Sequence, residues 1–458
     1  MGRAPVRVAY HTFGCKANQY DTERMRQELE ARGARTVRDA RGAGTVHVVN
    51  TCTVTNRADA DARSLIRRIR RKDPHARIVV AGCSAALKAA DYRAMAETSG
   101  VVEGHDPLAV AQVVAGTLEV AGSPGDFSGG FPGPSGPPLV QLEHRGRELH
   151  QVDREPVGAE LLLRRKGAAR GWLKVQDGCD RKCAFCATRL ARGRSRSRPA
   201  EEVVREARTL ARHHPELVLT GIHIGHYGLD LSPRASLGTL VARLLDDVPG
   251  VRLRLGSVEA TEVDDRLLSI LAHSDGRLVP HLHMPLQSGA DPVLRRMRRW
   301  HTREMYRARA LEIAEKFEFL GLGADIITGF PGETDEDHAQ TVALVEELPF
   351  TYLHVCPFSP REGTVAAELQ REMPVPQRVA GERSKELRDI VQGKGEAYRR
   401  RRAGTRARVV LEGAGSSALT EDYLRVGVMG PLPEDHRGLH DVELAEVDGE
   451  LSAVFTSG

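Results

Sequence analysis

Residues 178–186 read GCDRKCAFC and place three cysteines, Cys179, Cys183 and Cys186, within nine positions. The segment is polar and contains glycine, so these thiols have no apolar core to fill. A tetrahedral zinc site needs four ligands, and no fourth Cys or His lies nearby, since the next histidine is His213. Three thiolates fit an iron–sulfur cluster that leaves one iron open for an exogenous ligand. The spacing therefore predicts such a cluster at Cys179, Cys183 and Cys186.

A second set of three cysteines is spread along the first part of the chain. Cys15 follows a predicted strand, whereas Cys52 and Cys83 each end one. Because the carboxyl ends of parallel strands meet at one edge of a sheet, the three thiols would lie together where open α/β sheets bind ligands. Gly14 and Gly82 would allow a bulky group to approach the backbone. The sequence thus favours a second three-thiolate pocket, and three independent buried cysteines are the alternative.

The remaining cysteine and the cysteine count bear on the cellular compartment. Cys356 lies among Val355, Pro357 and Phe358, which predicts a small apolar residue in a core strand and not a ligand. Seven cysteines, an odd number in a chain of 458 residues, argue against a disulfide framework. The N-terminus lacks the apolar core of a signal peptide, and no segment approaches the roughly 20 apolar residues of a membrane span. We expect a cytoplasmic protein without membrane contact.

The strand and helix pattern divides the 458 residues into β/α units and a small β module. Three short β-rich runs alternate with charged helical runs at the start, which indicates a parallel sheet. They span residues 6–13, 45–52 and 76–83, and helices are predicted at 20–33 and 60–72. A Gly/Pro-rich stretch follows, and then six more strands alternate with helices, which predicts a barrel or partial barrel. These six strands are predicted at 172–176, 216–221, 251–257, 281–287, 321–329 and 352–358, with helices such as 199–214 and 335–348 between them.

The domain boundaries follow from these patterns. We predict an N-terminal β/α domain over 1–120, a linker and connecting segment over 121–168, a barrel over 169–402 and a β module over 403–458. Catalytic groups of such a barrel lie at the carboxyl ends of its strands. Both cysteine sets occupy positions of this kind, because Cys179 comes just after the first barrel strand.

The motifs, in their order along the chain, resemble the radical S-adenosylmethionine (SAM) methylthiotransferases. The spacing C-x3-C-x2-C at 179–186 is the radical SAM signature. The other matching stretches are HTFGCKANQYDTE (11–23), VVNTCTVTNRADADAR (48–63), VAGCSA (80–85), ARGRSRSRP (191–199), HLHMPLQSG (281–289), GFPGETDED (329–337) and PFSPREGT (357–364). The resemblance covers nearly the whole chain. It departs from the family after Cys186, where Ala187, Thr188 and Arg189 replace the usual apolar pair and proline.

The resemblance implies an N-terminal domain with an auxiliary cluster, a radical SAM partial (β/α)6 barrel and a C-terminal OB-like β domain called TRAM. It assigns one 4Fe-4S cluster to Cys15, Cys52 and Cys83, and another, which binds and cleaves SAM, to the radical SAM cysteines. In the family, the resulting 5'-deoxyadenosyl radical removes hydrogen from an unactivated carbon, which then receives a methylthio group. A flavodoxin- or ferredoxin-type electron donor and a sulfur donor are implied as partners.

Further SAM contacts are expected in two motifs. Gln287 and Ser288 belong to HLHMPLQSG, and Gly329 and Glu333 belong to GFPGET. The second motif is equally well explained as a strand-to-helix turn, in which the carboxylate of Glu333 suits the dipole of the following helix.

The substrate branch also comes from the resemblance. GCKANQYDTE (14–23), residues 281–302 and residues 348–364 are most similar to the enzymes that act at C2 of N6-threonylcarbamoyladenosine beside the tRNA anticodon, position 37. Other branches act on isopentenyladenosine in tRNA or on an aspartate of a ribosomal protein. A non-catalytic RNA-binding iron–sulfur protein is the alternative of a different class.

Two basic stretches agree with a tRNA substrate. RLARGRSRSR (189–198) has five arginines and no acid, and residues 378–408 have eleven Lys and Arg against four Glu and Asp. Lysine and arginine on a phosphate backbone supply much of the affinity for nucleic acid. The overall charge of +4 would not by itself indicate such a partner, and a solvated charged face is the alternative for both stretches. The predicted RNA contacts are Arg192, Arg194, Arg196, Arg198, Arg399 and Arg400.

Overall fold

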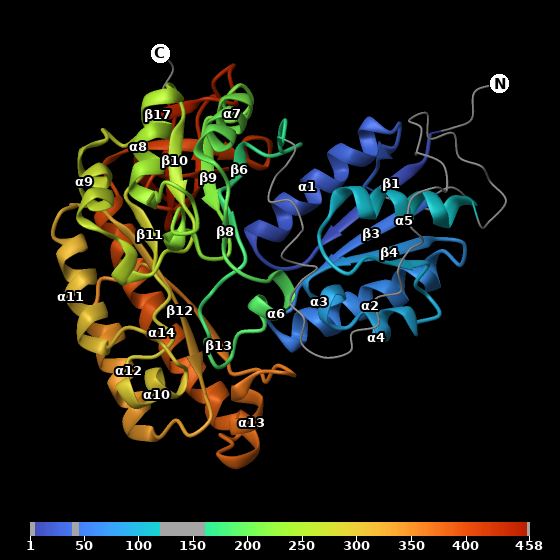
Figure 1. Cartoon of the computed structure of the whole chain (residues 1–458). Coiled ribbons are helices and arrows are strands. Elements are labelled where there is room, and N and C mark those ends of the chain that lie inside the picture. The colour runs from blue at the N-terminus through green and yellow to red at the C-terminus, as the bar shows by residue number, and fades with distance from the viewer. Residues whose placement is uncertain (1–4, 39–44, 120–160, 456–458) are drawn as a thin grey trace. The chain divides into compact units, whose positions relative to one another are not determined.

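The computed structural model describes residues 5–38, 45–119 and 161–455 (Figure 1). They separate into two compact units. Unit 1 comprises Met1–Leu162, Gly178–Asp180 and Ala187–Arg194, and unit 2 comprises Leu163–Asp177, Arg181–Cys186 and Ser195–Gly458. Most of the Gly/Pro-rich segment predicted over 121–168 lies outside the described residues.

Unit 1 is built on a five-stranded parallel sheet in the order β2-β1-β3-β4-β5. Every residue of the central strand β3 is buried, because helices cover both faces of the sheet (Figure 1). Val48 packs with Met25 of α1 (Lys16–Ala31) and Val110 of α5 (Pro107–Glu119), whereas Val49 packs with Ile66 of α2 (Asn56–Lys72) on the other face. The strands are β1 (Arg7–Thr12), β2 (Arg35–Thr36), β3 (Thr45–Thr51), β4 (Arg77–Gly82) and β5 (Gly100–Val101). The three longer ones confirm the prediction.

The helices of unit 1 begin earlier than their hydrophobic periodicity indicates. α2 starts at Asn56 and not at residue 60, because the hydroxyl of Thr55 accepts a hydrogen bond from the Ala58 amide and caps the helix. α1 starts at Lys16, with Cys15 as its N-cap residue. The helices are α1 (Lys16–Ala31), α2 (Asn56–Lys72), α3 (Cys83–Leu87), α4 (Ala89–Arg93), α5 (Pro107–Glu119) and the short α6 (Thr188–Arg192).

Unit 2 contains the predicted partial barrel. Its six strands form two three-stranded parallel sheets, β6-β9-β10 and β11-β12-β13, and a parallel bridge between Ser257 and His283 links β10 to β11. The strands are β6 (Arg170–Lys174), β9 (Glu216–Thr220), β10 (Arg252–Leu255), β11 (His281–His283), β12 (Gly321–Thr328) and β13 (Tyr352–Pro357). All six were predicted. β11 is shorter than expected and ends at His283, although Gln287 still forms an isolated parallel bridge with Ile326 of β12.

Helices alternate with these strands and cover the outside of the barrel (Figure 1). α12 begins at a capping box in which Thr334 and Asp337 exchange hydrogen bonds. The helices are α7 (Ala200–Ala211), α8 (Leu237–Asp247), α9 (Asp265–His273), α10 (Asp291–Arg296), α11 (Arg303–Ala314), α12 (Asp335–Glu347), α13 (Val365–Glu372) and α14 (Gln377–Arg402). In the part of the chain that the structure describes, no helix has the length and apolar character needed to cross a bilayer.

After α14 the chain forms a closed five-stranded barrel in the order β14-β15-β16-β18-β17, which agrees with the predicted TRAM-like module. Its core includes Val409, Leu411, Val426 and Leu444. The strands are β14 (Arg406–Glu412), β15 (Ser417–Leu419), β16 (Arg425–Met429), β17 (Leu439–Val447) and β18 (Glu450–Val454).

A buried ionic network joins this module to the starting ends of the large-barrel strands. Glu216, the first residue of β9, pairs with Arg252 at 2.6 Å and Arg254 at 2.9 Å, and it is fully buried. The two arginines also donate to carbonyl groups of the module, including those of Arg408 and Thr420. Although burial acts to raise the pKa of Glu216, the guanidinium groups hold it well below its ordinary value. These contacts of the module thus occupy the starting ends of β9 and β10.

A buried histidine in unit 2 gives a testable pH dependence. His214 Nε2 accepts a hydrogen bond from the Arg165 amide at 2.9 Å, and Nδ1 lies 3.2 Å from the Ala169 carbonyl. Burial lowers the pKa of His214 from 6.5 to about 4. As the pH falls, His214 in the unfolded chain therefore binds a proton before His214 in the folded chain does. The contribution of neutral His214 to the free energy of unfolding is fully present above pH 6.5 and is lost as the pH falls toward 4. The loss is about 1.4 kcal/mol per pH unit or less.

We expect the thermal unfolding midpoint to fall between about pH 7 and pH 5 and His214→Gln to make this fall shallower. Glutamine does not titrate, and it keeps an acceptor for the Arg165 amide. Calorimetric scans of the cluster-containing protein across this pH range measure the effect. Equal pH dependence in the two proteins would contradict the expectation.

Candidate functional site

The three cysteines of unit 1 lie at the carboxyl ends of its adjacent central strands. Cys15 follows β1 as the N-cap residue of α1, Cys52 comes directly after β3, and Cys83 comes directly after β4 and begins α3. Cys15 is exposed, whereas Cys52 and Cys83 are buried. The proximity of Cys52 and Cys15 contributes to the raised pKa of the Cys83 thiol. The parallel sheet thus brings the three sulfur atoms toward one edge, as the sequence predicts.

Gly14 keeps this edge open for a large group. Its φ is 97°, which favours glycine, and a Cβ atom there would lie 2.5 Å from the sulfur of Cys52. Gly82, which precedes Cys83, has φ of 98°, and an added Cβ would overlap Asn50 and the Thr51 carbonyl. Any side chain at Gly14 would therefore occupy the space beside Cys52.

Hydrogen-bond donors point at the sulfur atoms of this site. The Val54 amide lies 3.3 Å from Cys52 Sγ, and Arg192 Nε lies 3.3 Å from Cys83 Sγ. His105 Nε2 is 3.7 Å from Cys83 Sγ, and it donates to this sulfur only in the tautomer that carries the proton on Nε2. Burial raises the pKa of the Cys83 thiol to about 12, and the Arg192 guanidinium opposes this rise. A thiolate at Cys83 therefore needs further positive charge, which the iron of a cluster provides, and the donors suit cluster-bound sulfur.

Arg192 does not lie on the surface. Its Nη2 atom is 2.6 Å from Asn18 Oδ1 and 2.7 Å from Asp21 Oδ2, and the side chain is fully buried. Arg198 is equally buried in unit 2, where it pairs with Glu206 at 3.0 Å and donates to the Lys174 carbonyl at 2.8 Å. The prediction that Arg192 and Arg198 contact RNA is therefore wrong. Both guanidinium groups form ion pairs with buried carboxylates and cannot reach a phosphate backbone.

The radical SAM motif lies in the connection from β7 (Gln176–Asp177) to α6. In unit 2, Cys183 and Cys186 are joined by a hydrogen bond from the Cys186 amide to the Cys183 carbonyl. Arg299 Nη1 lies 3.7 Å from Cys183 Sγ, and Nη2 pairs with Glu259. Burial raises the pKa of the Cys183 thiol, and the Arg299 guanidinium opposes this rise. Arg299, which we did not identify from the sequence, is thus a cationic partner of a predicted ligand.

The backbone around the motif is held at several points. In unit 2, the Ala184 amide donates to the Met297 carbonyl, and the Ala184 carbonyl accepts from the Ala366 amide. Phe185 meets the ring of Phe330 edge to face at 6.5 Å. In unit 1, the Cys179 amide donates to the Gly193 carbonyl at 3.1 Å. These contacts fix the backbone on which the three predicted ligands stand.

The predicted SAM-contacting residues all have partners within the protein. Ser288 is fully buried, and its hydroxyl lies 3.4 Å from Thr341 Oγ1 and accepts from the Ala290 amide. Gln287 exchanges backbone hydrogen bonds with Asp325 and Ile327. These contacts hold the turn that follows β11 in place.

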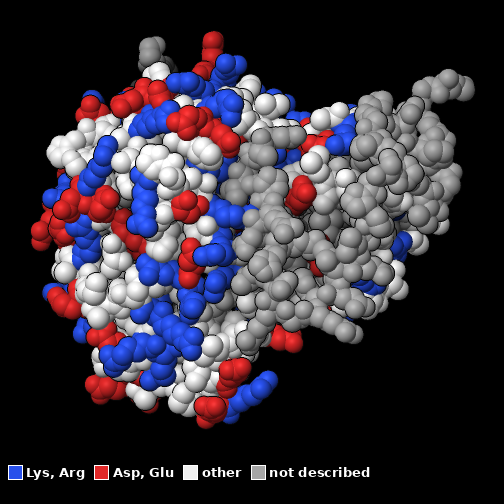
Figure 2. All heavy atoms as spheres, in the orientation of Figure 1, with Lys and Arg blue, Asp and Glu red and all other residues white. Residues whose placement is uncertain are grey.

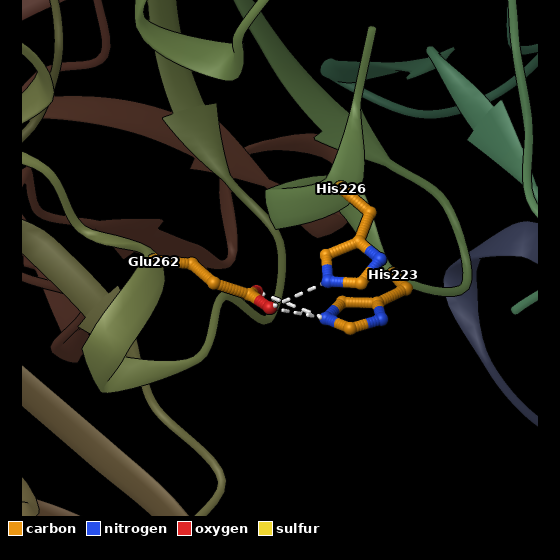
Figure 3. A group of neighbouring side chains, drawn as sticks. All are labelled: His223, His226 and Glu262. Carbon is orange, nitrogen blue, oxygen red and sulfur yellow. Dashed lines mark hydrogen bonds and ion pairs between the residues drawn. The ribbon is translucent and has the colours of Figure 1, made fainter. Parts of the chain in front are cut away.

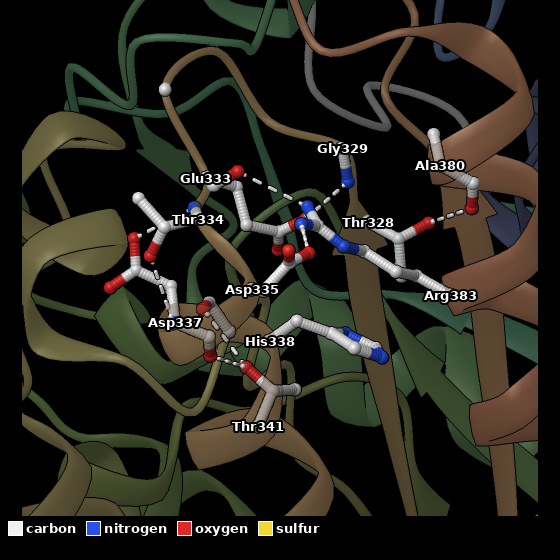
Figure 4. Close-up of polar contacts among 12 residues, drawn as sticks. Thr328, Gly329, Glu333, Thr334, Asp335, Asp337, His338, Thr341, Ala380 and Arg383 are labelled. Atoms are coloured by element: carbon white, nitrogen blue, oxygen red, sulfur yellow. Dashed lines mark hydrogen bonds and ion pairs between the residues drawn. The ribbon is translucent and has the colours of Figure 1, made fainter.

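The carboxylate of Glu333 is held by contacts with neighbouring parts of the chain (Figure 4). Its carboxylate accepts from the Gly329 amide at 2.6 Å and pairs with Arg383 of α14 at 2.7 Å. Arg383 also pairs with Asp335 in the first turn of α12. The contacts of Glu333 and Gly329 are those of the strand-to-helix turn, the alternative that the sequence left open.

A histidine–glutamate cluster at the carboxyl ends of β9 and β10 escaped sequence analysis. The rings of His223 and His226 stack at 4.0 Å, and their Nε2 atoms lie 2.8 Å and 3.2 Å from Glu262 Oε1 (Figure 3). Although burial acts to raise it, the pKa of Glu262 is lowered to about 2, chiefly by the hydrogen bond with His223. Arg181, from the cysteine motif, lies 3.3 Å from Glu262 and stacks on Trp300. The cluster therefore positions the cysteine motif within unit 2.

Three neighbouring strands carry a second polar group. His283 of β11 and His354 of β13 each lie 3.1 Å from the carboxylate of Asp325 of β12. Cys356, two residues after His354, is exposed. The prediction of a core position for Cys356 is wrong, because alternate residues of β13 point away from the packed face of the sheet.

The other predicted RNA contacts are more accessible. Arg194 and Arg400 are exposed, whereas Arg196 and Arg399 are partly buried. Arg399 and Arg400 belong to the last turn of α14, just before the small barrel, and Arg399 donates to the Arg425 carbonyl at 3.1 Å. On the face shown in Figure 2, basic and acidic side chains are interspersed over unit 2.

Known proteins share both the sequence and the fold of this chain. Residues 7–103 match the family described as "Uncharacterized protein family UPF0004", and residues 173–345 match the radical SAM superfamily. The threonylcarbamoyladenosine tRNA methylthiotransferase MtaB of Bacillus subtilis is 35% identical over 80% of this chain and 76% of its own length. The protein of the same name from Rickettsia prowazekii is 32% identical over 93% of this chain and 92% of its own.

Other similarities agree with these matches. A tRNA-2-methylthio-N(6)-dimethylallyladenosine synthase of Sorangium cellulosum is 32% identical over 97% of this chain and 88% of its own length. The radical SAM methyltransferase TsrM of Kitasatospora setae, solved with cobalamin and a [4Fe-4S] cluster, has a similar fold, with a TM-score of 0.54, 15% identity and coverage of 84% of this chain and 85% of its own. Since relatives above 30% identity match along most of their length, this chain belongs to the radical SAM methylthiotransferase family.

Proposed function

We propose that the protein is a tRNA methylthiotransferase that inserts a methylthio group at C2 of N6-threonylcarbamoyladenosine at position 37, beside the anticodon. The observation that carries this proposal is the extended match to relatives named for this reaction, such as the Bacillus protein at 35% identity. The two sets of three cysteines agree with it, because the chemistry needs both a SAM-cleaving cluster and a site that delivers sulfur. As an enzyme acting on tRNA, the protein would work in the cytoplasm.

Each cysteine set would hold one 4Fe-4S cluster. Cys15, Cys52 and Cys83 would hold the auxiliary cluster, where the thiols, the Gly14 opening and the N–H donors to sulfur fit such a group. Cys179, Cys183 and Cys186 would hold the radical SAM cluster. With SAM bound there, such a cluster would supply radical chemistry, which is needed to remove hydrogen from a carbon that no acid or base side chain can deprotonate.

The protein's own residues hold and orient these groups. Arg299 places a guanidinium group 3.7 Å from Cys183 and is itself fixed by Glu259 and the Pro285 carbonyl. Gln287 and Gly329 remain the proposed SAM-binding positions through their backbones, because both have a positive φ in the turns after β11 and β12. Ser288 and Glu333 would act indirectly, since their side chains fix these two turns.

The proposed tRNA contacts are Arg194, Arg196, Arg399 and Arg400. Replacement of Arg399 and Arg400 by glutamate should weaken tRNA binding and lower the slope of log affinity against log salt by about one to two units, since each phosphate contact contributes about one. Fluorescence anisotropy over a salt series measures both quantities. Arg212→Glu is the control, because Arg212 is an exposed arginine at the end of α7, outside both basic stretches. If the slope of log affinity against log salt is unchanged in the double variant, these arginines belong to a solvated charged face and do not contact tRNA.

Reconstituted enzyme, SAM and a reductant should convert tRNA that carries threonylcarbamoyladenosine, with 5'-deoxyadenosine formed in parallel. tRNA that carries isopentenyladenosine tests the alternative branch, to which the Sorangium relative belongs by name. Product from the second tRNA alone would contradict the substrate. Failure to form 5'-deoxyadenosine with intact clusters would favour a non-catalytic RNA-binding protein. In cells, a flavodoxin- or ferredoxin-type protein would deliver the electrons, and a separate donor would replenish the sulfur.

A further inference from the structure

Arg192 makes contacts in unit 1 that no RNA-binding role explains. Its Nε atom lies 3.3 Å from Cys83 Sγ, while Nη2 lies 2.6 Å from Asn18 Oδ1 and 2.7 Å from Asp21 Oδ2. The Arg192 side chain has no exposed surface, and the Asp21 side chain is 5% exposed. A buried arginine with this geometry has its guanidinium plane fixed, because three separate acceptors determine where its N–H groups point.

The acceptors are themselves held in place. Asn18 Nδ2 donates to the carbonyls of Phe13 and Thr51, both at 2.9 Å, so its Oδ1 atom must face Arg192. Asn50 Nδ2 in turn donates to the Asn18 carbonyl at 2.8 Å. This chain of hydrogen bonds starts from strands β1 and β3 and ends at the sulfur of Cys83. The direction of the N–H···S contact is therefore set by the sheet that also carries the cysteines.

The packing of α6 supports the same arrangement. Ala191, the residue before Arg192, packs with Cys83 and Ala86 of α3 in a small apolar cluster. Along the sequence, Arg192 follows Cys186 by only six positions. One short segment thus provides a predicted ligand of the radical SAM cluster and a hydrogen-bond donor to a predicted ligand of the auxiliary cluster.

We propose that Arg192 is a positioning residue of the auxiliary site, which orients the Cys83 sulfur and raises the reduction potential of the cluster bound there. The inference rests on the assignment of Cys15, Cys52 and Cys83 as ligands. An N–H donor withdraws electron density from a ligand sulfur, and a nearby guanidinium group favours the reduced, more negative cluster. Asp21 balances part of the positive charge, but the Nε–H donor to Cys83 remains. Loss of Arg192 should therefore make the cluster harder to reduce.

The test is an EPR-monitored redox titration of the full-length chain in a Cys183→Ala background, in which the auxiliary cluster is the one that remains. Arg192→Gln removes the charge and should shift the potential to more negative values. Arg192→Lys keeps the charge but loses the fixed Nε–H, and it should give a smaller shift in the same direction. Arg189→Gln removes an arginine from the same helix and serves as the control with the parental potential.

Iron content separates the failure of this inference from the failure of the proposed function. A parent that holds no cluster would overturn both, because the auxiliary site itself would be absent. A parent with a cluster whose potential is unchanged by Arg192→Gln would overturn the role of Arg192 alone. If Arg192→Gln does not retain its cluster, the reduction potential of Arg192→Lys provides the test. A potential of Arg192→Lys equal to that of the parent would then contradict the proposal.

Discussion

Replacement of Cys183 by alanine should abolish the reductive cleavage of SAM and leave about half of the iron bound. A radical SAM cluster is held by three thiolates, so loss of one ligand removes the cluster that binds SAM. The auxiliary site depends on other cysteines and should keep its iron. Liquid chromatography of 5'-deoxyadenosine, together with iron and sulfide analysis of the reconstituted protein, measures both effects. We expect no 5'-deoxyadenosine above the enzyme-free background.

Cys356→Ala is the matched control for this experiment. Cys356 is an exposed cysteine on β13 that we do not assign to either cluster, so its loss should leave the iron content and SAM cleavage unchanged. SAM cleavage at the parental rate by Cys183→Ala would show that Cys183 is not a ligand of the SAM-binding cluster. The loss of iron in both variants would point to a general effect of cysteine removal.

Replacement of Cys52 by alanine should separate the two halves of the reaction. Cys52 is buried at the end of β3, close to the opening at Gly14, and it belongs to the site that would deliver sulfur. We expect 5'-deoxyadenosine to form at a rate near that of the parent, while the methylthio product on tRNA falls below detection. Mass spectrometry of the digested tRNA and the 5'-deoxyadenosine assay on the same samples provide the two readouts.

A Gly14→Ala variant tests the same site without removing a thiol. Its Cβ atom would lie 2.5 Å from Cys52 Sγ, and φ of 97° is unfavourable for alanine, so we expect reduced iron at the auxiliary site. For Cys52→Ala, formation of the methylthio product at the parental rate would refute the assignment of Cys52 as a ligand. The result for Gly14→Ala does not change that conclusion.

The strands and the cysteine sets could be predicted because both are local signals. β3 and β12 show in the sequence as β-rich runs bounded by turns, and the three cysteines of unit 1 each stand at the end of such a run. Parallel pairing then brings them to one edge of the sheet without further information. The closed C-terminal barrel could be anticipated for the same reason, since its short strands follow the last long helix.

Burial of charge could not be predicted. Arg192 and Arg198 belong to a stretch with five arginines and no acid, which resembles a phosphate-binding surface. Their partners are Asp21, which is 171 positions from Arg192, and Glu206, on the helix after Arg198. A charge count over residues 189–198 cannot show that carboxylates outside this stretch neutralise its arginines in the folded state.

The histidine cluster was missed for a related reason. His223 and His226 are three positions apart, but Glu262 follows a different strand, so the group exists only when β9 and β10 pair. Arg299 likewise reaches Cys183 from 116 positions away. A pattern search over single motifs finds the ligands but not the residues from other elements that hold them.

The most direct test of the proposed reaction is mass spectrometry of nucleosides from total tRNA of cells that lack this protein, compared with cells complemented by the parental chain or by Cys183→Ala. We predict that the methylthio form of threonylcarbamoyladenosine is absent without the protein, returns with the parental chain and does not return with Cys183→Ala. Unmodified threonylcarbamoyladenosine should accumulate in its place. A methylthio-threonylcarbamoyladenosine level that is unchanged by loss of the protein would contradict the account.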